Sequence, residues 1–192
     1  NIGARYQEAT GAKIRGLYFE GPYFTEKYKG AQNPSYMKDP RMDEFRAWQK
    51  AANGLLNKIA LAPEREGVEE FVRTVTGEGV TVALGHSNAT FDEAKKAVDA
   101  GASVWVHAYN GMRGLTHREL GMVGAMYELP HTYAELICDG HHVDPKACDI
   151  LLKQKGTENI ALITDCMTAG GLEDGDYMLG EFPVVVANGT AP

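Results

Sequence analysis

The chain has 192 residues, of which 44% are hydrophobic and 23% are charged, and its formal net charge is −7. This is the composition of an ordinary globular protein with one sizeable core. The acidic charge argues against nucleic acid as a partner, because phosphate backbones bind basic faces, and no apolar run approaches the roughly 20 residues of a membrane span.

Short apolar runs alternate with helical patterns along the whole chain. The runs predict strands at residues 14–19, 58–62, 80–84, 103–106, 134–138 and 160–163. Helices are predicted between them at 42–53, 66–76, 90–100 and 145–155. Thr90 and Glu93 have the spacing of a capping box, and Asp144-Pro145 is a typical helix start.

Strands that alternate with helices predict a parallel sheet in an α/β fold. Six units, each with polar residues after the strand, fit the last six units of a (β/α)8 TIM-type barrel, whose active sites lie at the carboxyl ends of the strands. An open doubly wound sheet is the alternative, but no G-x-G-x-x-G motif opens a helix after a strand. We expect residues 1–176 to form a partial barrel with two open sheet edges and 177–192 to begin a small β domain.

Three potential metal ligands follow three different strands, namely Glu20, His86 and His107. Three nitrogen or oxygen ligands with one open position form a catalytic zinc site. A single His at a strand end is more often an ordinary hydrogen-bonded residue, but three equivalent positions strengthen the case. Asp165 closes the last predicted strand, where a carboxylate could move a proton, or simply cap a turn.

Two further segments carry polar chemistry. His142, in the run Asp139-Gly140-His141-His142, could stabilise an oxyanion. Arg118 offers a planar fork for a phosphate, and Gly111 would let a ligand approach the backbone, although on these residues alone a solvated loop with an ordinary surface Arg is the more common case.

The three cysteines, Cys138, Cys148 and Cys166, are odd in number and form no C-x-x-C pair. No disulfide framework is expected, and a cytoplasmic location fits. The chain begins and ends abruptly without a secretory signal, and 182–186 resembles a strand with nothing to pair with. These features suggest a piece of a longer protein.

Six short motifs occur together in a familiar order. They are L-Y-F-E-G-P at 17–22 with K-G-A-Q-N-P at 29–34, G-H-S-N-A-T at 85–90, V-H-A-Y-N-G-M at 106–112, H-R-E-L-G at 117–121, D-G-H-H-V at 139–143 and T-D-C-M at 164–167. This series resembles the signatures of N-acetylglucosamine-6-phosphate deacetylases, a branch of the amidohydrolase superfamily, from about residue 14 to residue 180.

The resemblance implies a metal-dependent hydrolase that converts N-acetyl-D-glucosamine 6-phosphate into glucosamine 6-phosphate and acetate in amino-sugar catabolism. Glu20, His86 and His107 would bind the divalent metal, zinc or another such as iron. Asp165 would be the general base and then the general acid, and His142 would contact the acetyl carbonyl. The sugar phosphate would lie against Ala31, Asn110, Gly111, Arg118, Asp139, Gly140, His141 and His142. Family members are usually homodimers, and the phosphate-binding Arg can come from the neighbouring subunit.

The chain departs from the family pattern in several places. Gln32 stands where many members have His, Gly111 replaces Ala, and Leu120 replaces Pro. The first barrel strand, with its H-x-H pair, is absent. Two alternatives stay open: another amidohydrolase that acts on a cyclic amide or N-acyl substrate, and a non-catalytic barrel remnant.

Overall fold

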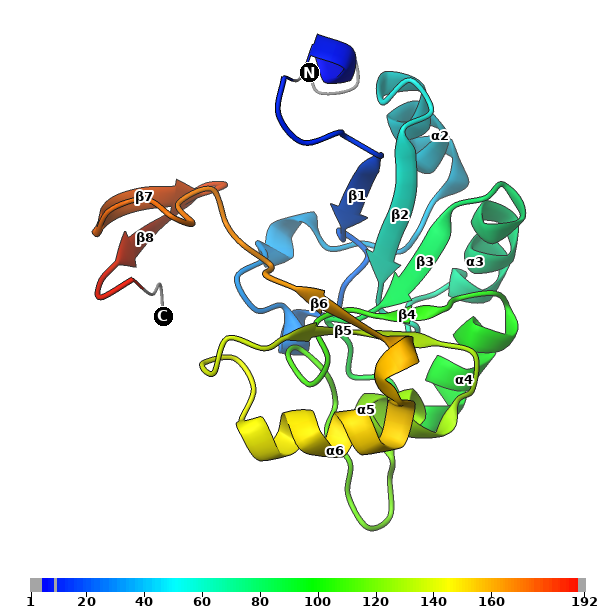
Figure 1. The fold of residues 1–192 in the computed structure, drawn as a ribbon. Helices are drawn as coiled ribbons and strands as arrows, with labels where there is room; N and C mark the ends of the chain where they lie inside the picture. The colour runs from blue at the N-terminus through cyan, green and yellow to red at the C-terminus, as the bar shows by residue number, and fades with distance from the viewer. Residues whose placement is uncertain (1–4, 9, 190–192) are drawn as a thin grey trace.

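The computed structural model describes residues 5–8 and 10–189 and shows one curved parallel sheet with helices on its outer face (Figure 1). Its six strands follow one another in the order of the sequence, and every neighbouring pair is parallel. A doubly wound sheet would reverse its strand order at a switch point. The unbroken order therefore confirms the partial-barrel prediction. The strands are β1 (Leu17–Glu20), β2 (Leu56–Leu61), β3 (Thr81–Leu84), β4 (Val104–Trp105), β5 (Tyr133–Ile137) and β6 (Ile160–Ile163).

Helices connect successive strands and cover the convex side of the sheet. They are α2 (Met42–Ala51), α3 (Val68–Gly77), α4 (Phe91–Asp99), α5 (Gly121–Glu128) and α6 (Pro145–Lys155), with short 3-10 turns η1 (Tyr6–Glu8), η2 (Glu26–Tyr28), η3 (Pro34–Tyr36) and η4 (Thr157–Asn159). Helix α5 was not predicted. Six of its eight residues are buried, so it has no polar face to produce a helical period. No helix among the described residues is long and apolar enough to cross a bilayer.

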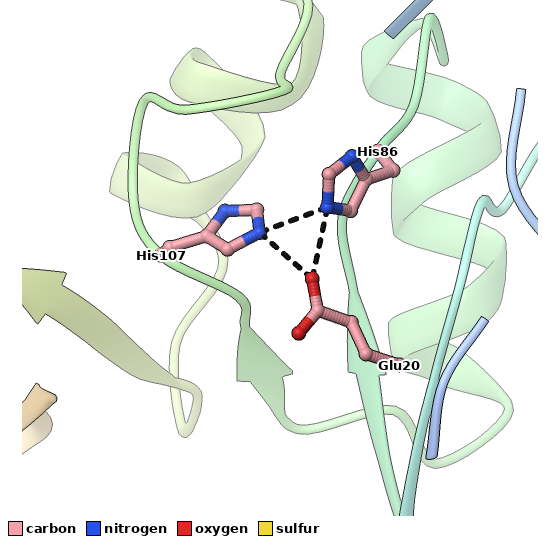
Figure 2. Close-up of side chains that lie close together, drawn as sticks. All are labelled: Glu20, His86 and His107. Carbon is pink, nitrogen blue, oxygen red and sulfur yellow. Dashed lines mark hydrogen bonds and ion pairs between the residues drawn. The ribbon is translucent and has the colours of Figure 1, made fainter. Parts of the chain in front are cut away.

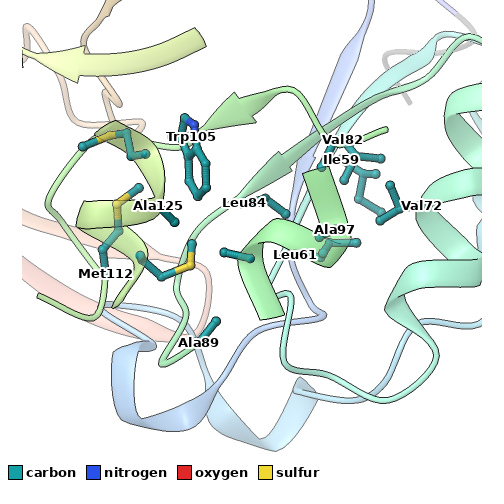
Figure 3. Packing of buried hydrophobic residues seen from close by; sticks show 14 of the residues in the cluster. Ile59, Leu61, Val72, Val82, Leu84, Ala89, Ala97, Trp105, Met112 and Ala125 are labelled. Carbon is teal, nitrogen blue, oxygen red and sulfur yellow. The ribbon is translucent and has the colours of Figure 1, made fainter. Parts of the chain in front are cut away.

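The main core lies between the sheet and these helices (Figure 3). Ile59 and Leu61 of β2 and Leu84 of β3 point into it, together with the fully buried Trp105. Alternate residues face the concave side of the sheet, where Ala60 and other residues form a separate small cluster. Ala60 and Ala83 are small residues of this cluster and leave room for polar groups at the strand ends.

Strand β6 is more exposed than its apolar sequence indicates, because apolar runs of this kind are typical of strands buried on both faces. Ala161 and Leu162 are exposed, Leu162 to 74%. The reason is that, among the strands of residues 10–189, β6 pairs only with β5 and forms one edge of the sheet, as β1 forms the other. The predicted pair of open edges is therefore present.

A separate hairpin follows the sheet, formed by the antiparallel strands β7 (Gly175–Leu179) and β8 (Phe182–Val186). The expectation that 182–186 has nothing to pair with was wrong, because β7 pairs with it along its length. Glu181, in the turn, accepts hydrogen bonds from Asn33 Nδ2 at 3.1 Å and Tyr36 Oη at 2.9 Å. The hairpin turn thus contacts the loop after β1.

Candidate active site

Three predicted site residues meet at the carboxyl end of the sheet (Figure 2). Glu20 is the last residue of β1, while His86 and His107 each lie two residues beyond β3 and β4. Glu20 Oε1 lies 2.9 Å from His86 Nε2 and 3.3 Å from His107 Nε2, and the two Nε2 atoms are 3.0 Å apart. Both histidines are buried, so these polar atoms face one another with little access to water.

The hydrogen bonds of the two Nδ1 atoms determine what the Nε2 atoms present toward Glu20. His86 Nδ1 lies 2.7 Å from the Tyr28 carbonyl oxygen, and His107 Nδ1 lies 3.1 Å from that of Asn110. A carbonyl can only accept, so each Nδ1 carries the proton and donates it. In the neutral rings both Nε2 atoms then present lone pairs to the same point as the Glu20 carboxylate. Three converging acceptors fit a divalent cation, and histidines held from behind by carbonyls are typical of metal sites.

The electrostatics of the three residues are coupled. Burial opposes the charge of Glu20, but hydrogen bonds from His107 and His86 outweigh it and lower the pKa of Glu20 to about 2. Burial also opposes the charge of His107, yet the Glu20 carboxylate, with a smaller contribution from Asp165, raises the pKa of His107 above its usual value. Without a metal, a proton on His107 relieves the repulsion between the lone pairs.

The backbone turns into the left-handed region at three predicted site residues. The φ angles are 47° at His86, 28° at His107 and 50° at Asp165. Residues other than glycine rarely adopt this conformation, and such strain is concentrated at functional sites. It lets each strand end abruptly and direct a side chain toward the concave side.

Gly111 lies directly behind the His86 ring. Its φ is 59°, and a Cβ atom there would lie 3.0 Å from His86 Nδ1. Gly30 approaches the same ring from the loop after β1, where a Cβ atom would lie 3.2 Å from Cε1. Glycine at both positions allows the loops to close around this histidine.

The acid/base candidates lie apart from the three converging side chains. Asp165 is exposed just beyond β6, close enough to raise the pKa of His107. His142 Nδ1 pairs with Asp139 Oδ2 at 2.7 Å, and Asp139 Oδ1 also accepts the backbone N–H groups of His141 and His142. These bonds hold the pKa of Asp139 well below its usual range. Among the described contacts, none joins His142 to Glu20, His86 or His107.

The predicted substrate residues are spread over several loops. Ala31 is exposed and lines a cavity of about 290 Å3 beside the β7–β8 turn. Asn110 is half-buried and supports His107 through its carbonyl. Gly140 and His141 are exposed in the turn after β5. Arg118 is exposed on the loop before α5, which projects away from the sheet in Figure 1. The structure therefore does not gather these residues into one pocket.

One polar residue at this end of the sheet was missed by the sequence analysis. Glu64 follows β2 and accepts hydrogen bonds from Thr25, Ser87 and Asn88. The available signal was its place after a predicted strand, which it shares with Glu20. It carries no ligand motif, so nothing else marked it.

The fold and the three converging side chains define a class. A parallel β/α barrel wall with a Glu and two His at its strand ends is the arrangement of the amidohydrolase type of barrel enzyme, which uses a metal ion at that face. No family model matches the chain. It is nevertheless a homologue of the N-acetylglucosamine-6-phosphate deacetylases, as the following comparisons show.

The chain is 44% identical over 186 residues to N-acetylglucosamine-6-phosphate deacetylase of Vibrio furnissii, which covers 97% of the chain and 46% of that protein. It is 45% identical over 169 residues to N-acetylgalactosamine-6-phosphate deacetylase of Escherichia coli O157:H7, covering 88% of the chain and 45% of the relative. The Mycobacterium smegmatis N-acetyl-D-glucosamine-6-phosphate deacetylase D267A mutant, solved with N-acetyl-D-glucosamine 6-phosphate, superimposes with a TM-score of 0.93 at 34% identity, covering 99% of the chain and 50% of that structure. The chain thus spans about half the length of the relatives it matches.

Proposed function

We propose that the protein containing this chain hydrolyses the acetamide of N-acetyl-D-glucosamine 6-phosphate to glucosamine 6-phosphate and acetate. The observation that carries the proposal is the meeting of Glu20, His86 and His107 with both Nε2 lone pairs turned toward the carboxylate. The identity of 44% with the Vibrio furnissii deacetylase supports the same reaction.

Glu20, His86 and His107 are the proposed ligands of a divalent metal, and zinc suits a set of two imidazoles and one carboxylate. When bound, such an ion polarises an amide carbonyl and makes water more acidic. The residues of the chain supply the rest: the Tyr28 and Asn110 carbonyls fix the two rings, and the buried surroundings of the histidines limit access of bulk water.

Asp165 is the proposed proton carrier. As water adds to the acetyl carbon, the Asp165 carboxylate accepts its proton, and it returns that proton to the nitrogen as the C–N bond breaks. His142 is proposed to donate a hydrogen bond to the acetyl oxygen. Its Nδ1 donates to the Asp139 carboxylate, so Nε2 faces the substrate and donates this bond in the imidazolium form of the ring, in which both nitrogens carry protons.

The sugar phosphate is proposed to contact Arg118, whose fork suits a phosphate, with Ala31, Asn110, Gly111 and residues 139–142 along the sugar. Because the loop that carries Arg118 is exposed and projects from the sheet, we propose that it serves a neighbouring subunit in a homodimer. A cytoplasmic location and a small β domain that begins near residue 177 complete the proposal.

N-acetyl-D-galactosamine 6-phosphate is a second candidate substrate. The Escherichia coli relative named for that sugar is 45% identical to the chain, and Gln32 stands where many N-acetylglucosamine-6-phosphate deacetylases have His. A comparison of kcat/KM for the two sugar phosphates separates the candidates.

The Asp165→Asn variant of the full-length protein tests the mechanism. Loss of the proton carrier should lower kcat for acetate release by roughly 10²- to 10⁴-fold, while metal content stays unchanged. The matched control is Asp176→Asn, an exposed Asp on β7, which should keep normal turnover. Near-normal activity of the Asp165 variant would show that another group carries the proton. A wild-type protein that binds metal but releases no acetate from either sugar would contradict the deacetylase proposal.

A further inference from the structure

Glu64 is the acceptor for three hydrogen bonds that come from two different loops. Its Oε1 accepts from Thr25 Oγ1 at 2.5 Å and from the Asn88 backbone N–H at 2.7 Å, and its Oε2 accepts from Ser87 Oγ at 2.7 Å. Thr25 belongs to the loop after β1, and Ser87 and Asn88 belong to the loop after β3. The carboxylate at the end of β2 therefore joins the loops on both sides of it.

The loop after β1 holds His86 at two points. The Thr25 backbone N–H donates to the His86 carbonyl at 3.0 Å, and the Tyr28 carbonyl, three residues further on, accepts from His86 Nδ1 at 2.7 Å. Since Thr25 is also bound by Glu64, the carboxylate fixes the start of the segment that orients the His86 ring.

The loop after β3 extends the same connection to the second histidine. Ser87 N–H donates to the Gly111 carbonyl at 2.9 Å, and Arg113 N–H donates to the Ser87 carbonyl at 3.0 Å. Gly111 and Arg113 belong to the loop after β4. Asn110 directly precedes Gly111 in this loop, and its carbonyl accepts from His107 Nδ1. Glu64 is thereby connected to His86 through Thr25 and to His107 through Ser87 and the loop after β4.

A carboxylate suits this position for a chemical reason. Three donors converge on it, and an ionised carboxylate accepts at both oxygens without offering a donor of its own. Ser87 is fully buried, and its Oγ already accepts from Ala89 N–H at 2.9 Å, so its proton needs an acceptor on the other side. An amide at position 64 would present an NH2 group to at least one of these donors.

We propose that Glu64 is a positioning residue of the metal site: it locks the loops after β1, β3 and β4 together and so sets the orientation of the His86 and His107 rings. This inference rests on the metal site of the proposed function, and it is independent of which substrate the protein deacetylates. None of the hydrogen bonds described for Glu64 goes to Glu20, His86 or His107, so its effect on the ligands passes through Thr25, Ser87 and Asn88.

The test measures cobalt binding to the full-length protein after its metal has been removed with a chelator. Competition with the chelator gives the Co2+ affinity, and the visible absorption of Co2+ reports the ligand geometry. Glu64→Ala should weaken Co2+ binding by roughly 10- to 100-fold, as changes behind metal ligands typically do, and should alter the spectrum. Glu64→Gln, which keeps one acceptor oxygen, should fall between Glu64→Ala and wild type.

Glu66→Ala is the matched control, because Glu66 is exposed two residues further on and should bind Co2+ like wild type. If Glu64→Ala does not fold, Thr25→Val removes one of the three bonds and should show a smaller loss of affinity in the same direction. A Glu64→Ala or Thr25→Val protein with wild-type affinity and spectrum would overturn the inference, as would a wild-type protein that binds no Co2+. A wild type that binds Co2+ without releasing acetate would contradict the deacetylase proposal alone.

Discussion

The orientation of the His86 and His107 rings is fixed by backbone carbonyls that bond their Nδ1 atoms, on the side away from Glu20. The carbonyls of Tyr28 and Asn110 accept hydrogen bonds from the two Nδ1–H groups, so the Nε2 atoms of the neutral rings present lone pairs toward Glu20. Such a set is stable in two ways: with a proton on His107, or with a cation that replaces that proton. The proton and the cation therefore compete, and the competition depends on pH.

The pH dependence of stability should differ between the metal-free and metal-loaded protein. In the metal-free protein Glu20 contributes stability above its usual pKa of 4.5, which is lost as the pH falls toward about 2. His107 contributes below its usual pKa of 6.5, and this is lost as the pH rises through its raised folded value. Metal affinity rises over that same upper range. The difference in Tm between the zinc-loaded and metal-free protein should thus grow as the pH rises above the usual pKa of His107, 6.5, in scanning calorimetry. A difference that stays constant with pH would contradict competition at His107.

At the scale of elements, α4 begins directly after the loop that Glu64 holds. Thr90 Oγ1 accepts from the Glu93 N–H at 3.3 Å, and Glu93 Oε2 accepts from the Thr90 N–H at 2.8 Å. This capping box, which the spacing of Thr90 and Glu93 predicted, is confirmed. It fixes the point at which the chain leaves the site and enters the outer helical layer.

Thr90→Ala should lower the free energy of unfolding by about 1 kcal/mol, because it removes the side-chain acceptor at the first turn of α4. Urea denaturation of the metal-free protein measures the change. Thr74→Ala is the control: its hydroxyl bonds the Glu70 carbonyl within α3, where the backbone has its own partners, so the change should stay within about 0.5 kcal/mol. Equal losses at the two positions would show that the cap adds nothing beyond an ordinary helix contact.

Elements with a clear hydrophobic period were predictable from the sequence. Strand β6 and helix α6 have the predicted bounds, since alternation of apolar runs and amphipathic stripes reports local structure. Helix α5 lacked such a stripe. The strand-end position of Glu20, His86 and His107 was also visible, but their left-handed turns were not, and neither was Glu64, because its bonds join residues 23 and 39 positions apart. Contacts between loops leave no period in a sequence.

At the scale of the whole molecule, an ion pair on the concave face connects distant strands of the sheet. Lys58 of β2 forms an ion pair with Glu135 of β5, although β3 and β4 lie between these two strands in the sheet. The Lys58 Nζ atom also lies 4.1 Å from the ring centre of Tyr18 on β1. Burial, with smaller contributions from nearby carboxylates, raises the pKa of Tyr18 well above its usual value. These contacts span most of the sheet and favour its curvature beneath the site.

A double-mutant cycle measures that contribution. Lys58→Met and Glu135→Leu should each destabilise the protein by roughly 1–3 kcal/mol, because each leaves a mostly buried charge without its partner. The double variant should lose less than the sum of the two single losses, since neither charge is then left alone. Denaturant unfolding of the four proteins gives the coupling. Additive losses would show that the two side chains act independently of each other.

The left-handed turns at His86 and His107 also restrict the substitutions that the site can accept. Aspartate and asparagine tolerate this backbone conformation far better than β-branched residues do. An exchange of His for Asp is therefore compatible with the backbone angles; it replaces an imidazole nitrogen with a carboxylate oxygen and removes the Nδ1 bond to the Tyr28 or Asn110 carbonyl. Oxygen ligands suit magnesium, manganese and calcium, whereas imidazole suits zinc. The backbone thus leaves open a short route from a zinc-type ligand set to one for harder cations, for natural variation and for protein engineering alike.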